Sequence, residues 1–217
     1  GYGLEDWSED IAELADRLEL ERFCVIGIAG GGPYAMACSV HLGSRVRKLC
    51  LVASDVPIDE LPGNARVGLP RKLLTSMARH WPKGAKALLE IRFRKMYEDP
   101  DKAILDFVER GGEADKALLH DPEIYRICQR NLKEAGEIPR SVLSDELIML
   151  SKPWGFSVSD IPAPTLLWHG RQDHYCPPEH AEALSDLIPD CTPVIRDDWG
   201  HYFYYAQWRL LLAQIAS

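Results

Sequence analysis

A glycine-rich turn near the N-terminus constrains the fold of this chain more than any other stretch. The apolar residues 23–28 lead directly into the glycine cluster 27–32, and small and apolar residues of helical character follow it. This pattern predicts a strand, a sharp turn and a helix from about Gly30 to Leu42, ending at Gly43. Such a turn needs glycine because its backbone must enter positive φ and because neighbouring segments approach too closely for a Cβ. The unit is typical of α/β proteins.

The same alternation of helices and apolar strands recurs at both ends of the chain. We expect strands at 23–28, 48–53, 165–169 and 192–195, and helices at 6–20, 178–187 and 203–215. The first two strands are continuously apolar, which predicts burial on both faces and a mostly parallel sheet between helices. Residues 57–153 differ, with many charges and prolines and only helical patterns. We predict an α/β core of residues 1–56 and 154–217, with 57–153 inserted as a helical cap or lid; a separate helical domain is the alternative.

Composition excludes several classes of function. The 217 residues carry a formal net charge of −8, which argues against nucleic acid as a partner. No apolar run reaches the roughly 18 residues of a membrane span, and the N-terminus does not resemble a signal peptide. The six cysteines are scattered without a C-x-x-C pair, so neither disulfides nor a zinc site is expected. We expect a soluble, cytoplasmic protein that binds neither nucleic acid nor membrane.

Residues suited to catalysis follow each predicted strand, where α/β proteins place their sites. Gly27-x-Ala29-x-Gly31 has the form of the nucleophile elbow Gly-x-Ser-x-Gly, with alanine in place of the serine. Asp55 follows the second strand, Asp173 the third and His201 the fourth. Nucleophile position, acid and histidine thus occur in the order that α/β-hydrolases use.

Two further segments extend this likeness. Residues 166–178, with Gly170-x-x-Asp173 and a proline shortly after, resemble the acid turn of that superfamily, and Gly200-His201 resembles its histidine loop. The resemblance to lid-bearing serine hydrolases and esterases covers nearly the whole chain. It implies a triad in which Asp173 orients His201, His201 takes a proton from a hydroxyl at position 29, and the Gly30 N–H stabilises an oxyanion.

The implied activity is hydrolysis of an ester or similar small, fairly apolar acyl substrate, with no cofactor and no metal. Ala29 has no nucleophilic atom, so this form is expected to be inactive by that route. An engineered substrate trap and a natural non-hydrolytic member both explain Ala29. We favour the first because the acid and the base are retained.

The first residues suggest that part of a larger sheet is missing. Residues 1–6 resemble the loop that follows the fourth strand of these hydrolases, which implies that earlier strands and the second oxyanion donor lie elsewhere. Residues 23–28 would then form an apolar edge, an aggregation hazard. We expect an N-terminal segment or a second chain to complete the sheet; homodimerisation is a further expectation.

Other functions fit parts of the sequence. Gly30-x-Gly32-x-x-Ala35 with Asp55 matches a dinucleotide fingerprint and predicts NAD binding, but it leaves Asp173 and His201 unexplained. Asp55 is also the alternative acid of a triad. A non-catalytic binding protein, or a lyase or cofactor-free oxygenase that uses the His201–Asp173 pair, would tolerate Ala29. Three nearby histidines are expected to pack or face solvent rather than bind metal, namely His169, His174 and His180.

Overall fold

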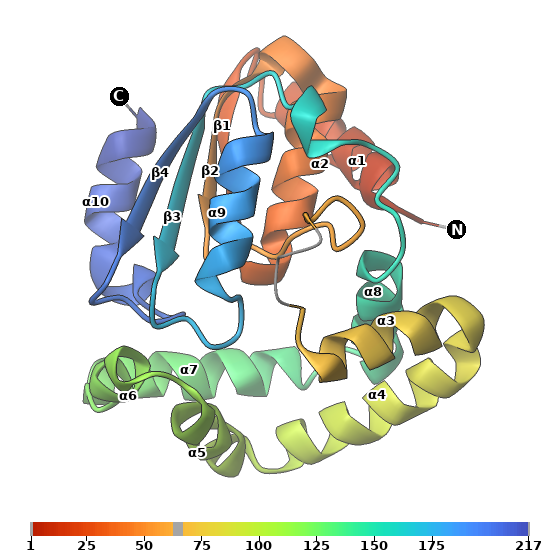
Figure 1. Ribbon diagram of the computed structural model, residues 1–217, viewed down its shortest axis with the longest axis vertical. Helices are drawn as coiled ribbons and strands as arrows, with labels where there is room; N and C mark the ends of the chain where they lie inside the picture. The colour runs from red at the N-terminus through yellow and green to blue at the C-terminus, as the bar shows by residue number, and fades with distance from the viewer. Residues whose placement is uncertain (1, 63–66, 217) are drawn as a thin grey trace. The chain divides into compact units, whose positions relative to one another are not determined.

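A computed structural model describes residues 2–62 and 67–216, and Figure 1 shows its helices and strands. The chain divides into two compact units, Gly1–Arg66 with Pro153–Ser217, and Val67–Lys152. The first unit holds the sheet. In its described part, the second unit is built from helices.

The sheet of the first unit is parallel throughout, as its apolar strands predict. Its strands are β1 (Phe23–Ile28), β2 (Val46–Val52), β3 (Thr165–Gly170) and β4 (Cys191–Arg196). They lie in the order β1-β2-β3-β4, and each neighbouring pair is parallel. The carboxyl ends of all four strands therefore meet at one edge. This edge carries the residues that sequence analysis singled out.

Helices cover both faces of this sheet (Figure 1). They are α1 (Leu4–Arg17), α2 (Gly32–Leu42), α9 (Pro178–Leu187) and α10 (Tyr204–Ala216). Leu49 and Leu51 of β2 belong to the core shared with α2 and α9, whereas Cys50 and Val52 pack with α10. Successive residues of a strand point to opposite faces, so a continuously apolar strand is what a sheet covered on both sides requires.

Strand β1 departs from the prediction of full burial. Among the described residues it pairs with β2 alone, and most of its side chains are only half-buried, whereas β2 is largely buried. Phe23 and Val25 reach one core while Cys24 and Ile26 reach the other. The two faces are contacted but the outer edge is not covered by a described strand, which explains the difference from β2.

The second unit is a set of helices around a small core of its own. The helices are α3 (Leu69–His80), α4 (Pro82–Glu98), α5 (Pro100–Arg110), α6 (Glu113–Leu119), α7 (Pro122–Ala135) and α8 (Arg140–Leu150). Three of them begin at a proline, which suits the first turn because that position needs no N–H donor. Leu89 and Phe93 of α4 pack with Ile148 of α8. No helix within the described ranges is long and apolar enough to cross a membrane.

Candidate active site

The turn after β1 holds Ala29 in a strained backbone conformation. Ala29 has φ of 48°, in the left-handed region that residues with a Cβ rarely adopt, and it opens the short 3-10 turn Ala29–Gly31 before α2. The backbone N–H of Asp55, after β2, donates to the Ala29 carbonyl at 3.0 Å. The neighbouring strand end therefore holds this conformation in place, as expected at an elbow.

The glycines of this turn serve close packing rather than positive φ. Among the described residues, the glycines with positive φ are Gly43 and Gly155, so the prediction of positive φ within 27–32 is wrong for the glycines. A Cβ on Gly27 would lie 2.7 Å from the Cβ of Ala35, and one on Gly32 would lie 1.8 Å from Ser54 Oγ. The expected close approach thus accounts for Gly27 and Gly32. A Cβ on Gly30 would meet nothing within 4 Å.

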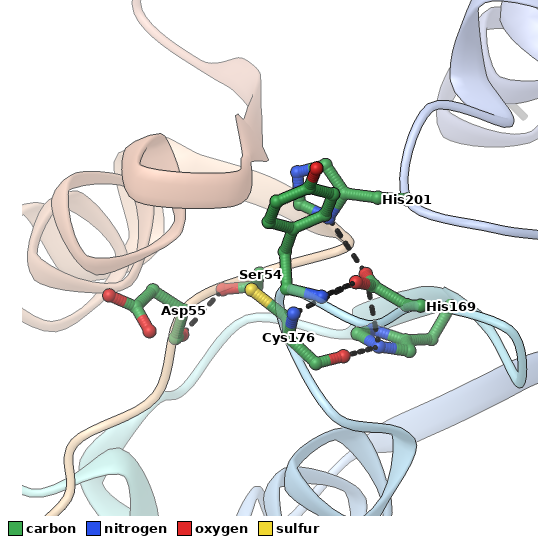
Figure 2. A network of polar contacts seen from close by, with 7 residues as sticks. Ser54, Asp55, His169, Cys176 and His201 are labelled. Atoms are coloured by element: carbon green, nitrogen blue, oxygen red, sulfur yellow. Dashed lines mark hydrogen bonds and ion pairs between the residues drawn. The ribbon is translucent and has the colours of Figure 1, made fainter. Parts of the chain in front are cut away.

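The turn after β3 surrounds a buried carboxylate with hydrogen-bond donors. Asp173 is 2% exposed. Its Oδ1 accepts the backbone N–H groups of Tyr175 and Cys176, each at 2.8 Å. Its Oδ2 lies 2.8 Å from Nδ1 of His201 (Figure 2). A buried carboxylate needs such partners to remain charged, and here both oxygens have them.

The loop that carries His201 is joined tightly to the acid turn. The N–H of Gln172 donates to the Trp199 carbonyl at 2.9 Å. A Cβ on Gly170 would lie 2.2 Å from that carbonyl oxygen, so only glycine permits the approach. The Trp199 ring stacks on Phe203 with centroids 4.3 Å apart and an interplanar angle of 7°. These contacts fix the position of His201, which is 8% exposed.

This arrangement can move a proton. A carboxylate only accepts hydrogen bonds, so Nδ1 of His201 is the donor and Nε2 of the neutral imidazole is left as the base. The structure thus brings together Asp173 and His201, as the sequence predicts. Gly30 lies in the exposed turn just before α2, next to Ala29. Whether Gly30 stabilises an oxyanion stays a prediction.

The alternative acid, Asp55, lies elsewhere at the same edge. Its Oδ1 accepts the N–H of Val56 at 3.0 Å, and its own N–H holds the Ala29 carbonyl. These two bonds give Asp55 a local role in the elbow. In contrast, Asp173 has a bond to His201.

Two residues contact the acid turn in a way that the sequence does not predict: His169, expected only to pack or face solvent, and Cys176, which was given no role. His169 is fully buried at the end of β3, and Cys176 is 7% exposed. The pattern available from sequence was a histidine directly before Gly170 and a cysteine three residues after Asp173. Neither spacing predicts a contact with Asp173, because the contacts of His169 and Cys176 form only when the turn folds back on β3.

One group of residues has side-chain atoms that could ligate a metal ion. Single ligand atoms of Asp173, Cys176 and His201 lie within 4.8 Å of one another. Carboxylate, thiolate and imidazole are ligands that zinc accepts. However, Asp173 Oδ2 and His201 Nδ1 are already paired with each other, and Oδ1 accepts two amides. A metal ion would have to replace the acid–base hydrogen bond, so these atoms fit a proton-transfer pair better.

Comparison with known proteins assigns the fold family. Residues 1–206 match the family described as the alpha/beta hydrolase fold, and the chain belongs to that family. It is similar to a 2-hydroxy-6-oxo-2,4-heptadienoate hydrolase of Pseudomonas putida, with 24% identity over 215 residues. It is also similar to a 2-hydroxy-6-oxononadienedioate/2-hydroxy-6-oxononatrienedioate hydrolase of Comamonas testosteroni, with 25% identity over 203 residues. The matched parts are 95% and 93% of this chain, but the chain spans only 66% and 63% of the length of these relatives.

Solved structures share the fold over nearly the whole chain. An esterase from Exiguobacterium antarcticum has a TM-score of 0.71 at 20% identity, covering 100% of this chain and 75% of the esterase. A meta-cleavage product hydrolase from Pseudomonas fluorescens, solved as a serine-to-alanine mutant complexed with acetates, has a TM-score of 0.62 at 21% identity. That match covers 100% of this chain and 71% of the hydrolase. These similarities confirm the α/β-hydrolase fold that the sequence predicts.

Proposed function

We propose that this site is the acid–base half of a serine-hydrolase centre, in which Ala29 occupies the nucleophile position. The observation that carries the proposal is the 2.8 Å contact between His201 Nδ1 and the buried carboxylate of Asp173. A buried carboxylate facing a histidine at the carboxyl edge of a parallel sheet is suited to activating a hydroxyl. The left-handed conformation of Ala29 at the end of β1 supports an elbow at that edge.

The proposed chemistry assigns one step to each residue. With serine at position 29, the hydroxyl oxygen attacks a carbonyl carbon while Nε2 of His201 takes its proton. Asp173 holds Nδ1–H and stabilises the imidazolium that forms. The Gly30 N–H, in the 3-10 turn just before α2, is proposed as one donor to the oxyanion. His201 then returns the proton to the leaving group, and water repeats the sequence to release the acid.

The direct test is to restore the hydroxyl by Ala29→Ser. We expect p-nitrophenyl ester turnover and fluorophosphonate labelling of position 29, both absent from the Ala29 protein. In hydrolases studied this way, loss of the triad serine lowers the rate by roughly a millionfold. The control is Ala29→Ser combined with His201→Ala, which keeps the hydroxyl but removes the base. Turnover equal in the single and double variants would rule out the proposed pair. No turnover in either variant, also when the segment proposed to complete the sheet is added, would count against a hydrolase.

The names of the similar proteins support a proposal for the substrate class. Both curated relatives are named for 2-hydroxy-6-oxo substrates, and the esterase is a structural neighbour. We propose that the Ala29→Ser protein cleaves a small acyl compound of one of these types. Comparing kcat/KM for 2-hydroxy-6-oxo-2,4-heptadienoate and p-nitrophenyl acetate distinguishes them. A preference for the dienoate would move the assignment from ester to carbon–carbon bond hydrolysis.

A binding protein is the second candidate, favoured by Ala29 itself. The elbow conformation and the acid–base pair are both present while the residue between them carries only a methyl group. Such a site would bind an acyl compound without consuming it. The Ala29 protein should then bind the dienoate in an equilibrium titration with no change in its absorbance over hours. Slow turnover of the dienoate by the Ala29 protein would instead favour a His201-dependent reaction that needs no serine.

We also propose that further strands complete the sheet beside β1. The support is that β1 is half-buried and pairs with β2 alone among the described residues, and that the curated relatives are longer than this chain. Amide hydrogen exchange tests this idea. Fast exchange in β1 of the isolated chain and protection after adding the missing segment would support it. Protection of β1 in a monomer of this chain would contradict it, and protection only in a homodimer would identify a second copy as the partner.

We propose that the helical unit Val67–Lys152 acts as the cap over the site. Its support is its insertion between β2 and β3, both of which end at the edge that carries the acid–base pair. In the Ala29→Ser protein, substitutions in this unit should alter preference among acyl chains more than they alter the rate with the smallest ester. Equal effects on all substrates would contradict a cap.

A further inference from the structure

A second histidine lies against the acid turn, and the proposed chemistry does not use it. His169 is the last residue but one of β3 and is fully buried. Its register partner on β4 is Ile195. Burying an imidazole costs free energy unless its nitrogens form hydrogen bonds. The contacts of the His169 ring therefore indicate its role.

The first contact defines the tautomer of His169. Its Nε2 lies 2.8 Å from the carbonyl oxygen of Cys176 (Figure 2). A carbonyl only accepts, so Nε2 carries the hydrogen and donates it. Nδ1 has no hydrogen-bond partner among the described residues. Burial lowers the pKa of His169, which keeps the ring neutral despite the nearby carboxylate of Asp173.

The second contact reaches the acid itself. The same Nε2 lies 3.5 Å from Asp173 Oδ2, the oxygen that pairs with His201. That distance is too long for a full hydrogen bond but places the N–H dipole beside the charge. Cys176 links the two contacts, because its N–H donates to Asp173 Oδ1 while its carbonyl accepts from His169. The acid turn is therefore tied to β3 through His169.

We propose that His169 is a positioning residue. As a neutral hydrogen-bond donor at the end of β3, it holds the Asp173 carboxylate in the orientation that His201 needs. This inference rests on the proposed function of the Asp173–His201 pair. Without His169, the hydrogen bond from Nε2 to the Cys176 carbonyl is lost, the turn gains freedom, and the carboxylate can rotate away from Nδ1. Second-layer partners of this kind orient the groups that they contact and tune their basicity.

The electrostatic consequence has a defined direction. The titratable neighbours that act on His169 are Asp173 on the same turn, His201 on the loop after β4 and His180 on α9. An N–H dipole beside Asp173 partly offsets its negative charge, which reduces the stabilisation of a protonated His201. Replacing His169 by an apolar residue should therefore strengthen the attraction between the Asp173 carboxylate and the Nδ1 proton of His201 while their bond persists, and weaken that bond if the carboxylate rotates.

The test uses two variants of the Ala29 protein, His169→Leu, which removes the donor, and His169→Gln, which offers a neutral N–H at similar reach. NMR of nitrogen-labelled histidine reports the His201 tautomer, its titration and the exchange of its Nδ1 proton with water. We expect His169→Leu to change the titration and speed the exchange, and His169→Gln to restore both towards the parent values. His41→Gln, on the exposed end of α2, is the matched control.

The outcome that overturns the proposal is a folded His169→Leu protein whose His201 tautomer, titration and exchange equal those of the parent. If His169→Leu does not fold, the His169→Gln variant tests the proposal instead. A folded His169→Gln protein that has lost the hydrogen bond between His201 and Asp173 would also contradict the proposal. Kinetics give an independent readout in the Ala29→Ser background. There, His169→Leu should lower kcat by about tenfold or more with little change in KM, by analogy with the loss of an outer hydrogen-bond partner at histidines that bind metals. If Ala29→Ser shows no turnover, the proposed function fails while the NMR result still decides the role of His169.

Discussion

The turn after β1 and the turn after β3 lie at the same edge of the sheet but are built differently. The first contains a residue in a strained backbone conformation, Ala29, and no side chain that can react. The second has no residue of positive φ between 170 and 176, and its geometry is set by hydrogen bonds to Asp173. The first turn is held by backbone contacts and close packing, whereas the second combines close packing at Gly170 with hydrogen bonds to the buried Asp173 carboxylate.

Under the proposed function, this difference explains how a site with alanine at the nucleophile position keeps its shape. The elbow is fixed by Gly27, Gly32 and the Asp55–Ala29 backbone bond, none of which involves the side chain at position 29. The acid turn depends on the chemistry of its side chains, since removing one donor leaves a buried charge without its partner. We therefore expect substitutions in the two turns to fail in different ways.

The largest expected effect is on kcat, which should fall far more for substitutions of the acid–base pair than for substitution of Asp55 near the elbow. In the Ala29→Ser protein, His201→Ala should lower kcat by roughly a millionfold, and Asp173→Asn by about ten-thousandfold, because Asn holds the imidazole in the wrong tautomer. Asp55→Asn tests the alternative acid and should cost much less. Initial rates with p-nitrophenyl acetate measure all three. A greater loss from Asp55→Asn than from Asp173→Asn would reverse the assignment of the acid.

The next effect concerns stability, at the glycines that allow close approach in each turn. Gly170→Ala places a Cβ 2.2 Å from the Trp199 carbonyl, a backbone atom that cannot move alone. Gly32→Ala meets Ser54 Oγ, a side-chain atom. Overpacking costs about 1–3 kcal/mol and occasionally more, so we expect Gly170→Ala to exceed this range and Gly32→Ala to fall within it. Urea denaturation measures both.

Two controls sharpen the glycine prediction. Gly30→Ala adds the same methyl group where nothing lies within 4 Å, so stability should change by no more than about 0.5 kcal/mol. Ser54→Gly should recover most of the loss in Gly32→Ala because it removes the atom in the way. If Gly30→Ala is as damaging as Gly170→Ala, close packing is not what selects glycine in these turns.

Local patterns in the sequence were sufficient to predict the fold. The predicted bounds of β1 match the structure, and the strands and helices around Asp173 and His201 were predicted to within a few residues. This succeeded because buried parallel strands and amphipathic helices each produce a characteristic local spacing of apolar residues. The pairing of Asp173 with His201 was predicted from the resemblance to α/β-hydrolases, together with the places of both residues after strands.

The remaining details depend on contacts between distant segments. Positive φ falls on Ala29 rather than on the adjacent glycines because the Asp55 amide and the packing of Gly32 on Ser54 set the backbone there. The role of His169 arises only when the acid turn folds back on β3. Such effects have no local signature in sequence.

The pH dependence of stability should come from the acid turn and not from the elbow. Burial lowers the pKa of His169, so below about pH 6.5, the ordinary value for histidine, the unfolded chain binds a proton that the folded chain does not. Stability from this residue is complete above that pH and is lost as the pH falls towards the lowered folded pKa. One proton limits the slope to about 1.4 kcal/mol per pH unit. His169→Gln should flatten the curve of unfolding free energy against pH, and His41→Gln should leave it nearly unchanged. A parent curve with the opposite slope, reduced by His169→Gln, would mean that folding raises the pKa of His169.

The smallest expected effect tests whether the elbow stores strain. A left-handed residue with a Cβ costs about 1–2 kcal/mol, and glycine avoids that cost but loses about 0.5–1 kcal/mol through greater freedom of the unfolded chain. Ala29→Gly should therefore stabilise the protein by up to about 1 kcal/mol. Ala37→Gly, within the regular helix α2, is the matched control and should destabilise it by at least about 1 kcal/mol. Chemical denaturation of both variants measures the difference. Equal losses in the two variants would mean that Ala29 is relaxed in its turn, and the contrast between a strained elbow and a relaxed acid turn would not hold.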